Sequence, residues 1–450
     1  MSVLDTSRPR CDTCKMTSTC IDLFAGCGGL SLGLANAGFS TSFCVEAHPD
    51  AFATYERNLV AQWPERHQWP DWLEKRAWKA QELLANHYAD LTAMRGKVDL
   101  IAGGPPCQGF STNGLRRPDD PRSQMVDVYL RYVEVVQPRL VLLENVVGFR
   151  SMKHRSGTTY SEYVVTRLKA LGYDVWSEIL KAADWGVAQK RPRFILVGAL
   201  KGTLPGIDPL LRLRVARKEF LAARGLKSDG TSAQEALSDL EAADRILPPD
   251  PEWGSRGFKA LVRSETALSP YQVLMRTGCD GQPTDMRLPR HSKVASERMR
   301  AILESCKRGV CISPADRSRL GIKKRSTTPL SASTPAPTIT TLPDDLIHYS
   351  EARAMSVREH ARLQSFPDWF AFQGPYTTGG QQRKLACPRF TQVGNAVPPL
   401  LAEALGEMLL SLLSVQRNNN PVHLSNRVDV KRKSSSNIGE VFSADFLAAL

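Results

Sequence analysis

The chain has 450 residues, 42% of them hydrophobic and 23% charged, which is the balance of a globular protein with two or three domains. We find no apolar run long enough to span a bilayer and no signal-peptide core in the N-terminal MSVLDTSRPR, which argues against membrane and secreted proteins. Ten scattered cysteines without the spacing of a disulfide scaffold indicate the reducing cytoplasm, and a net charge of +13 favours a polyanionic partner.

Residues 1–18 are expected to be an N-terminal extension. They contain Cys11-Asp12-Thr13-Cys14, two cysteines at the spacing found in zinc sites. A structural zinc site needs a second pair of ligands, and neither Cys20 nor the histidines supply one at a suitable spacing. We therefore expect plain thiols here and no metal.

Residues 19–200 alternate short apolar runs with helix-like stretches, the pattern of a mostly parallel sheet with helices on both faces. The link between the last two runs, residues 181–192, is too short for a crossover helix, so these strands are predicted to pair antiparallel. The predicted fold class is α/β with a Rossmann-like sheet. The predicted strands are Thr19–Phe24, Phe39–Val45, Val98–Ala102, Leu140–Leu143, Tyr173–Leu180 and Arg193–Ala199.

Between Leu59 and Tyr88 lies an insert that holds four of the eight tryptophans. Asp71 with Glu74 resembles a capping box at the start of a helix. We predict a helical insert, residues 59–88, that packs on the first domain. Stacking of its tryptophans on nucleic-acid bases is the less favoured alternative.

Residues 201–330 lose the alternation and gain glycine, proline and arginine, which predicts a second, smaller and irregular domain. The segment from Trp253 to Leu330 contains sixteen Lys and Arg residues and six Asp and Glu residues, which gives it a local charge of +10. Charge of this density is often a solvated surface. Over so long a segment it favours a polyanion, with nucleic acid as the first candidate.

After Pro335-Ala336-Pro337 the regular pattern returns, so residues 331–414 are predicted to complete the first domain. Pro399 to Leu413 reads as one amphipathic helix. Residues 415–450 are polar and include Lys431-Arg432-Lys433, which predicts a loose tail.

The first predicted strand runs into DLFAGCGGLS, residues 22–31, a glycine-rich turn that lets a ligand approach the backbone at a helix N-terminus. Glu46 follows Gly26 by twenty residues, where a carboxylate accepts hydrogen bonds from ribose hydroxyls. An adenosine-type cofactor is expected, and a dinucleotide is disfavoured because Ser31 stands where the third fingerprint glycine would be. Asp90, in ADLT, is expected to end a further strand and to bind the adenine amino group.

Chemically active side chains lie at the carboxyl ends of two further predicted strands and at the start of the last one. Cys107 lies in GGPPCQGFS, Glu144 ends the apolar run in LVLLENVVG, and Arg191 and Arg193 lie in QKRPR. Each also has a purely structural interpretation. The cysteine would be a small hydrophobic side chain in a loop, the glutamate a helix cap, and the two arginines part of a solvated run of charges. Because ligands bind beyond the carboxyl ends of strands in open α/β sheets, we favour a joint site.

A thiol, a carboxyl group and arginines beside an adenosine cofactor suggest one reaction. Addition of a thiolate to C6 of a pyrimidine makes C5 an enamine carbon that can attack an electrophilic methyl group. A hydrogen-bonded glutamate at N3 and an arginine at O2 stabilise the charge that develops on the ring. A neighbouring positive charge also lowers the pKa of the thiol.

With these motifs and with PAPTITT, REHARLQSFPD and QVGNAVPP, the sequence resembles the DNA (cytosine-5)-methyltransferase family, which uses S-adenosylmethionine. The likeness covers most of residues 19–200 and 326–413. It implies that Cys107 is the nucleophile, that Glu144 contacts N3, and that Arg191 and Arg193 support the cysteine and a flipped cytosine. The resemblance further implies a cofactor site of Phe24, Gly26, Gly28, Glu46, Asp90, Pro106, Asn395 and Val397.

By the same resemblance, residues 201–330 are the target-recognition domain for a specific duplex DNA sequence. An RNA methyltransferase on the same scaffold is the alternative, because one branch of the family modifies transfer RNA; the long basic segment favours DNA. A nicotinamide-dependent oxidoreductase would not explain PPCQ or ENV, and a non-catalytic relative would not keep Cys107 and Glu144. We expect a cytoplasmic, nucleoid-associated monomer of the restriction-modification or phage type, with a cognate restriction endonuclease as a second partner.

Overall fold

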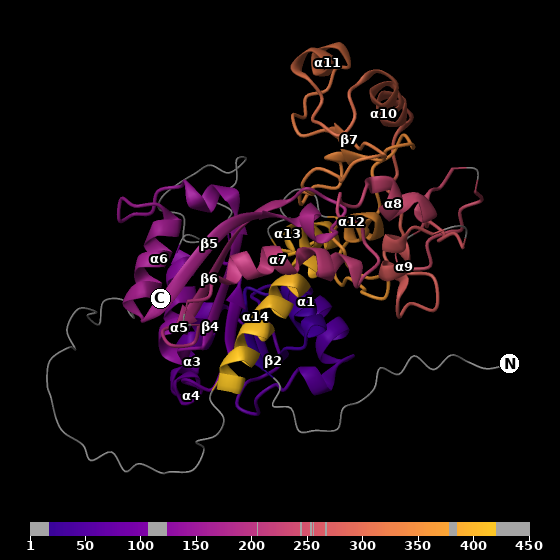
Figure 1. The fold of residues 1–450 in the computed structure, drawn as a ribbon. Helices are drawn as coiled ribbons and strands as arrows, with labels where there is room; N and C mark the ends of the chain where they lie inside the picture. Colours follow the sequence, from indigo (N-terminus) through magenta and orange to yellow (C-terminus); the bar gives the residue numbers. More distant parts are fainter. Residues whose placement is uncertain are drawn as a thin grey trace, which may run out of the picture.

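The computed structural model describes residues 18–419 except 107–123, 205, 244, 253, 255, 266–267 and 378–384. The expected nucleophile Cys107, the Cys11/Cys14 pair and residues 420–450 therefore lie outside the described residues. The described chain folds into a large domain around one sheet and a smaller lobe that projects from it (Figure 1).

The large domain contains a six-stranded sheet of order β2-β1-β3-β4-β6-β5. Neighbours among β1 to β4 pair parallel, and β6 pairs antiparallel with both β4 and β5. The predicted mostly parallel sheet with an antiparallel closing pair is confirmed. The strands are β1 (Thr19–Leu23), β2 (Ser40–Val45), β3 (Leu100–Gly103), β4 (Leu140–Val146), β5 (Tyr173–Lys181) and β6 (Pro192–Leu200).

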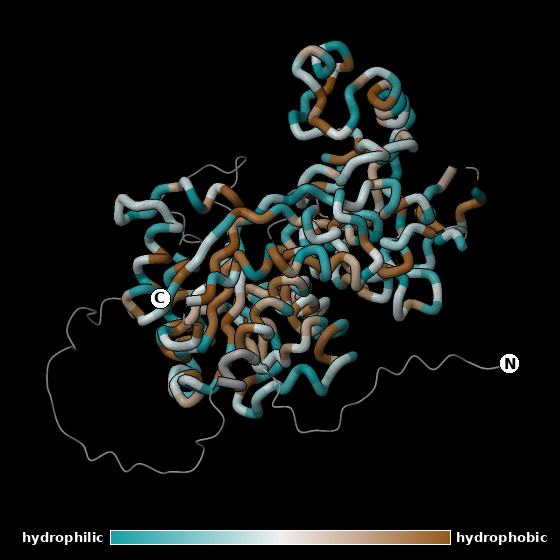
Figure 2. The backbone as a smooth tube through the Cα atoms, in the orientation of Figure 1, coloured by the Kyte–Doolittle hydropathy of each residue, from teal (hydrophilic) through white to brown (hydrophobic). Residues whose placement is uncertain are grey.

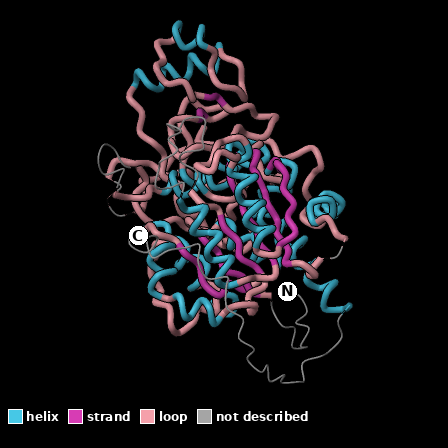
Figure 3. Tube along the Cα trace, turned by 90° about the vertical axis from the view of Figure 1, so that its left-hand side faces the viewer, coloured by secondary structure: helices cyan, strands magenta, loops and turns pink. Residues whose placement is uncertain are grey.

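Helices cover both faces of the sheet, because alternate residues of each buried strand point to opposite faces (Figure 3). Leu140 and Leu142 join a hydrophobic cluster with α1, α7 and α14, whereas Val141 and Leu143 join one with α5 and α6. The hydrophobic segments in Figure 2 concentrate in these layers. The helices in these two layers are α1 (Gly29–Ala37), α5 (Met125–Val136), α6 (Tyr160–Ala170), α7 (Pro209–Ala222) and α14 (Pro399–Asn419).

The C-terminal helix corrects two expectations. The segment Arg389–Ser414 is long and apolar enough to cross a membrane, although 78% of its most apolar window is buried inside the protein. It packs on α1 and α7 as a core helix, which accounts for its composition. The helix also continues to Asn419, past the predicted start of the tail at residue 415.

The tryptophan-rich insert packs as predicted but is less helical than predicted. The Asp71–Glu74 pair caps no helix, and residues 67–79 form turns before α3 (Ala80–Asn86) begins. Trp72 packs edge-on against Phe43 with ring centroids 5.8 Å apart. These tertiary contacts decide the local conformation against the weaker preference of one capping pair.

The first helix after residue 201 packs on the large domain. Helix α7 shares the hydrophobic cluster of the sheet through Leu210, Leu213 and Phe220, so it belongs to the large domain although it follows residue 201. Residues 233–237 and 270–276 also contribute Ala236 and Tyr271 to the cluster of the sheet, and the lobe adds two small clusters of its own and little regular structure. Its elements are α8 (Ala233–Leu237), η6 (Ser238–Leu240), α9 (Pro270–Arg276), α10 (Lys293–Ser305), α11 (Pro314–Arg319), β7 (Thr328–Pro329) and β8 (Leu346–Ile347).

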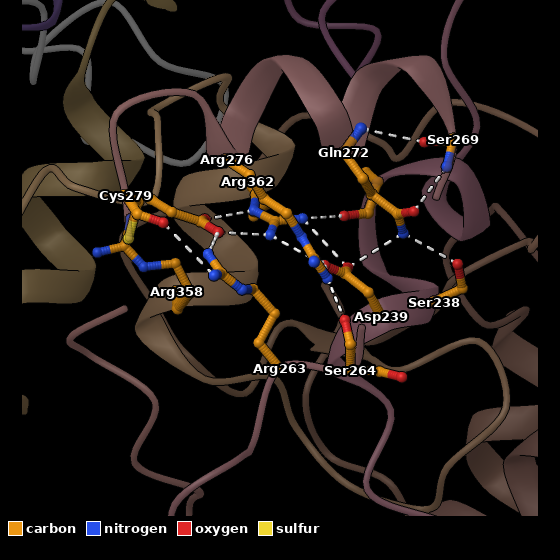
Figure 4. Close-up of polar contacts among 12 residues, drawn as sticks. Ser238, Asp239, Arg263, Ser264, Ser269, Gln272, Arg276, Cys279, Arg358 and Arg362 are labelled. Atoms are coloured by element: carbon orange, nitrogen blue, oxygen red, sulfur yellow. Dashed lines mark hydrogen bonds and ion pairs between the residues drawn. The ribbon is translucent and has the colours of Figure 1, made fainter. Parts of the chain in front are cut away.

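A buried ionic network joins the lobe to the large domain (Figure 4). Its centre is Arg362 on α12 (Val357–Leu363), a fully buried guanidinium. Arg362 Nε donates to Asp368 at 2.5 Å, and Arg362 Nη2 donates to Asp239 of the lobe at 3.1 Å. Two more lobe residues complete the network, because Arg276 pairs with Asp239 at 2.6 Å and Arg263 pairs with Asp368 at 3.1 Å. The two carboxylates therefore hold three arginines where water cannot replace them.

The network predicts a large cost for removing one of its carboxylates. Asp239→Ala leaves Arg276 and Arg362 partly unpaired at a buried site, so we expect the free energy of unfolding to fall by about 3–5 kcal/mol. Urea unfolding measures the change, with the exposed Asp174→Ala as the matched control at less than about 0.5 kcal/mol. Equal losses in the two variants would contradict the importance of the network.

Candidate functional site

The glycine-rich turn after β1 is open where a ligand would approach. Gly26 has φ +57°, and a Cβ built on it would meet no atom within 4 Å. Phe24 also adopts a positive φ, of 60°. Gly28 has φ +96°, but a Cβ there would lie 2.7 Å from Leu59 of the insert, so close packing also requires this glycine. The turn thus presents backbone to open space at Gly26 and packs tightly at Gly28.

Glu46 follows β2 directly and faces this turn. Its Oε2 accepts the Gly26 N–H at 2.9 Å, and its Oε1 accepts the His48 N–H at 2.7 Å. Burial raises the pKa of Glu46, and these two hydrogen bonds act in the opposite direction. Each carboxylate oxygen keeps a second lone pair, so Glu46 can accept further hydrogen bonds from hydroxyl groups.

Asp22 lies in β1 beneath the turn and is fully buried. Ser31 Oγ donates to Asp22 Oδ2 at 2.5 Å, and Tyr55 Oη donates to Ser31 Oγ at 3.0 Å. Asp22 Oδ1 has no hydrogen-bond partner among the described residues. Burial raises the pKa of Asp22 to about 7, so this carboxyl group keeps its proton at mildly acidic pH, where an ordinary aspartate is ionised.

Asp90 does not end a strand, contrary to the prediction from ADLT. It lies in the first turn of α4 (Tyr88–Ala93), where Oδ2 is 3.1 Å from His87 Nδ1. The His87 ring lies 5.5 Å from the ring of Trp78, whose backbone N–H donates to the Glu46 carbonyl at 2.8 Å. The segment forms a helix because an acidic residue is favourable in a first helical turn and Leu91 packs into the core beside it. Asp90 therefore lies on a helix and not at a strand end, and His87 and Trp78 connect it to Glu46.

The segment after α13 (Arg389–Asn395) reaches the glycine-rich turn from far along the sequence. A Cβ on Gly29 would lie 2.3 Å from the Val397 carbonyl oxygen, so only a glycine allows this approach. Val397 is buried, whereas Asn395 is exposed. Val397 is therefore brought next to the turn, and Asn395 lies two residues before it in the chain.

At the carboxyl ends of β3 and β4 the structure pairs Glu144 with Arg193. Arg193 Nε donates to Glu144 Oε1 at 2.8 Å, across the antiparallel β4–β6 pair. A Cβ on Gly104 would lie 3.1 Å from Glu144 Oε2, so the chain passes directly over this carboxylate. Asn145 Nδ2 donates to the Pro105 carbonyl at 3.1 Å. The described chain stops at Pro106, one residue before Cys107.

Arg191 has partners different from those of Arg193. Its buried guanidinium donates through Nη2 to the carbonyls of Gly394 at 3.0 Å and Ala396 at 2.8 Å. Its backbone has φ +25°, an unfavourable value for a side chain of this size. Arg191 therefore holds the segment that carries Asn395 and Val397, while Arg193 holds Glu144.

Two glutamines that the sequence reasoning did not single out brace the site. Gln189 Nε2 donates to Gln364 Oε1, and Gln189 Oε1 accepts the Ile339 N–H at 3.0 Å. Gln364 Nε2 donates to the Val393 carbonyl at 2.7 Å. Both glutamines lie inside sequence motifs of the family, QKRPR and REHARLQSFPD, so membership of those motifs was the available signal.

Several described cysteines are unsuited to nucleophilic chemistry. Burial raises the pKa of the thiols of Cys20 and Cys387 to about 12, and it raises those of Cys27 and Cys44 as well. A thiol with a raised pKa has little thiolate at neutral pH. Cys20, Cys27 and Cys44 are buried core side chains, and Cys387 is partly buried.

Known proteins resemble this chain in sequence and in fold. A family model described as C-5 cytosine-specific DNA methylase matches residues 18–411. The chain is 32% identical to the Type II methyltransferase M.AgeI of Thalassovita gelatinovora, over 88% of this chain and 99% of that one. It is 30% identical to the Type II methyltransferase M.DdeI of Desulfomicrobium norvegicum, over 86% and 88%. A crystal structure of a prophage-encoded E. coli protein assigned as a DNA modification methyltransferase superposes with a TM-score of 0.61 at 26% identity, over 88% and 100%.

The raised pKa of Asp22 predicts a pH-dependent stability. Between the ordinary value of 3.8 and about 7 the folded state keeps a proton that the unfolded state releases. Wild-type stability therefore loses about 1.4 kcal/mol per pH unit from this group across that window and is level above it. Asp22→Asn keeps an acceptor for Ser31 without a titrating proton, so its stability relative to wild type should rise from pH 4 to 7.

Urea unfolding of both proteins at pH 5, 6, 7 and 8 measures this difference. Ser31→Ala, which removes the hydrogen bond and leaves the carboxyl group, is the control and should keep the wild-type direction of the pH slope. A difference between wild type and Asp22→Asn that is the same at all four pH values would contradict the raised pKa.

Proposed function

Because the chain belongs to the C-5 cytosine-specific DNA methylase family, we propose that it transfers a methyl group from S-adenosylmethionine to C5 of cytosine within a specific duplex DNA sequence. The observation that carries the proposal is the Glu144–Arg193 ion pair at the carboxyl end of β4. It lies against Gly104, in the segment that leads to Cys107. A covalent pyrimidine mechanism requires a carboxyl group held in place and a thiol, and the segment that passes over Glu144 leads to one.

The residues around the glycine-rich turn fit an adenosine cofactor. Gly26 opens onto free space, and Glu46 has lone pairs left for two ribose hydroxyls. We assign Phe24, Gly26, Gly28, Glu46, Asp90, Pro106, Asn395 and Val397 to this site. When bound, S-adenosylmethionine supplies an electrophilic methyl group.

In the proposed mechanism the target cytosine leaves the duplex, because its C6 is stacked and unreachable inside the helix. The Cys107 thiolate adds to C6, which makes C5 nucleophilic. C5 gains the methyl group, with S-adenosylhomocysteine as the other product. A water molecule then takes the C5 proton, and the C6–S bond breaks, which releases the Cys107 thiolate and restores the aromatic ring.

Glu144 acts on N3 in its carboxylic acid form: its O–H donates a hydrogen bond, or the proton itself, to N3 and so stabilises the negative charge that the addition places on the ring. Arg193 orients Glu144 through their ion pair and lies beside the base. Arg191 acts as a positioning residue, since it holds the carbonyls of Gly394 and Ala396. This division refines the sequence-based expectation, which gave the two arginines one shared task.

We propose duplex DNA as the partner of the smaller lobe, within the recognition domain that the sequence assigns to residues 201–330. M.AgeI and M.DdeI are Type II methyltransferases, which supports a modification enzyme with a cognate restriction endonuclease. RNA remains the alternative substrate, to be tested beside DNA. We place the protein in the cytoplasm on DNA, as a monomer.

Cys107→Ser tests the nucleophile. The hydroxyl is a far weaker nucleophile at neutral pH, so methyl transfer to DNA should fall at least a thousandfold while cofactor affinity stays within about twofold. Transfer of tritium from labelled S-adenosylmethionine to plasmid DNA or to transfer RNA measures the activity and separates the two substrates. Cys311→Ser, at an exposed described cysteine, is the matched control and should keep full activity.

DNA with 5-fluorocytosine at the target should trap wild-type protein covalently, because fluorine cannot leave as the C5 proton does. The adduct is seen as a shifted band under denaturing conditions. Turnover by Cys107→Ser at the normal rate, or no adduct with the wild type, would overturn the mechanism.

Glu46→Ala tests the ribose contact. Charge-assisted hydrogen bonds contribute roughly 1.5–3 kcal/mol, so the Kd for S-adenosylmethionine should rise by roughly ten- to a hundredfold. Calorimetric titration measures the affinity, and binding of duplex DNA should change little. Glu56→Ala, at an exposed position after α2 (Pro49–Tyr55), is the control. An unchanged cofactor affinity would place the ribose elsewhere.

A further inference from the structure

The tryptophan-rich insert, residues 59–88, ends in a histidine that lies between two of its own aromatic rings. The His87 ring is 5.2 Å from the Trp72 ring, tilted by 41°, and 5.5 Å from the Trp78 ring, at an angle of 85°. His87 is also the junction of two helices, because α3 ends and α4 begins at this residue. Ring contacts and backbone together fix the position of the imidazole.

The two tryptophans are in turn fixed to β2 and to the residue that follows it. Trp72 packs edge-on against Phe43, which is fully buried in β2. The Trp78 N–H donates to the Glu46 carbonyl at 2.8 Å. The position of His87 is therefore set by the carboxyl end of β2, where the proposed function places the ribose of the cofactor.

His87 holds Asp90, which lies one helical turn further along α4. His87 Nδ1 is 3.1 Å from Asp90 Oδ2. A carboxylate only accepts hydrogen bonds, so the imidazole nitrogen beside it carries the proton and donates. The other oxygen, Asp90 Oδ1, makes no hydrogen bond to a described residue, and the side chain of Asp90 is 42% exposed. One oxygen of Asp90 is thus held by the protein, and the other is open to a ligand.

From these contacts we infer that His87 is a positioning residue for the adenine of the cofactor: it holds Asp90 so that Oδ1 accepts the 6-amino group of the base. Phe24, assigned to the same site, packs against the hydrophobic cluster that Trp72 also joins, so the insert adjoins the glycine-rich turn. The inference rests on the proposed function for the cofactor and for the assignment of Asp90 to its site. It gives the insert a task, which is to hold the adenine end of that site.

The arrangement selects a 6-aminopurine over a 6-oxopurine. An amino group donates to Asp90 Oδ1, whereas a 6-oxo group brings one acceptor against another and leaves both without a donor. The selection requires that Asp90 stay in place, because a carboxylate that is free to turn away neither rewards the amino group nor repels the oxo group. His87 supplies that restraint through its hydrogen bond.

Calorimetric titration with S-adenosylhomocysteine and with S-inosylhomocysteine, which carries an oxo group at position 6 of the purine, measures the selection. The wild-type protein should bind the adenosine compound roughly ten- to a hundredfold more tightly. His87→Phe keeps an aromatic ring between Trp72 and Trp78 but has no donor for Asp90. This variant should bind S-adenosylhomocysteine about tenfold less tightly, while its Kd for the inosine compound stays within about twofold of the wild-type value.

Two further variants separate the hydrogen bond from the ring. His87→Asn loses the ring but places an amide N–H near the position of Nδ1, so it should keep the ratio of the two affinities within about threefold of wild type. Tyr88→Phe removes a hydroxyl group from the neighbouring, exposed residue, which contacts Arg131 and not Asp90. It is the matched control and should bind both compounds as the wild type does. Thermal unfolding of each variant reports on the fold.

Equal losses for the two compounds in His87→Phe would overturn the inference, because general damage to the site weakens both. So would a wild-type protein that binds both compounds equally, or a loss of selection in His87→Asn as large as that in His87→Phe. The proposed function is judged separately, by methylation of plasmid DNA by the wild-type protein: its absence defeats that function, whereas its presence without selection between the two compounds defeats only the inference.

Discussion

The architecture depends on one buried guanidinium. Arg362 lies on α12, inside the large domain, and is held between Asp368 of its own segment and Asp239 of the lobe. A buried charge without a partner costs several kcal/mol, so these groups must meet whenever the chain is folded. Because Arg276 and Arg263 share the same two carboxylates, the lobe is fixed to the large domain at several points. The ionic network therefore determines where the recognition surface stands relative to the sheet.

The same helix supports the site on its other side. Gln364 follows Leu363, the last residue of α12, and links Gln189, two residues before Arg191, to the Val393 carbonyl. Arg191 then holds the carbonyls of Gly394 and Ala396, and Arg193 holds Glu144. A set of buried polar contacts thus runs from the lobe to the carboxyl end of β4 and the adjacent amino end of β6. These contacts restrict the orientation of Glu144. A polar group stabilises a developing charge only when it is held in the right orientation.

Charge illustrates how a count along the sequence differs from a surface. The window of residues 253–330 correctly marked a basic region, but a count treats Arg263 and Arg325 as equal. In the folded chain Arg263 is neutralised by Asp368, which lies more than a hundred residues away, and Arg325 is exposed. Proximity in space decides which charges are available to a ligand, and the sequence does not record it.

The sequence by itself determined the sheet, its antiparallel closing pair, the C-terminal helix and the family, because apolar periodicity and contiguous motifs are local properties. It also placed Glu144, Glu46 and the arginines at strand ends, where open sheets bind ligands. The tertiary structure alone decided that Arg193 pairs with Glu144 while Arg191 holds the segment at 394–396, that Asp90 lies on a helix, and that residues 67–79 form turns. In each case the deciding contact joins residues distant in sequence, or a weak local preference is overridden by packing, and neither leaves a periodic signal in the chain.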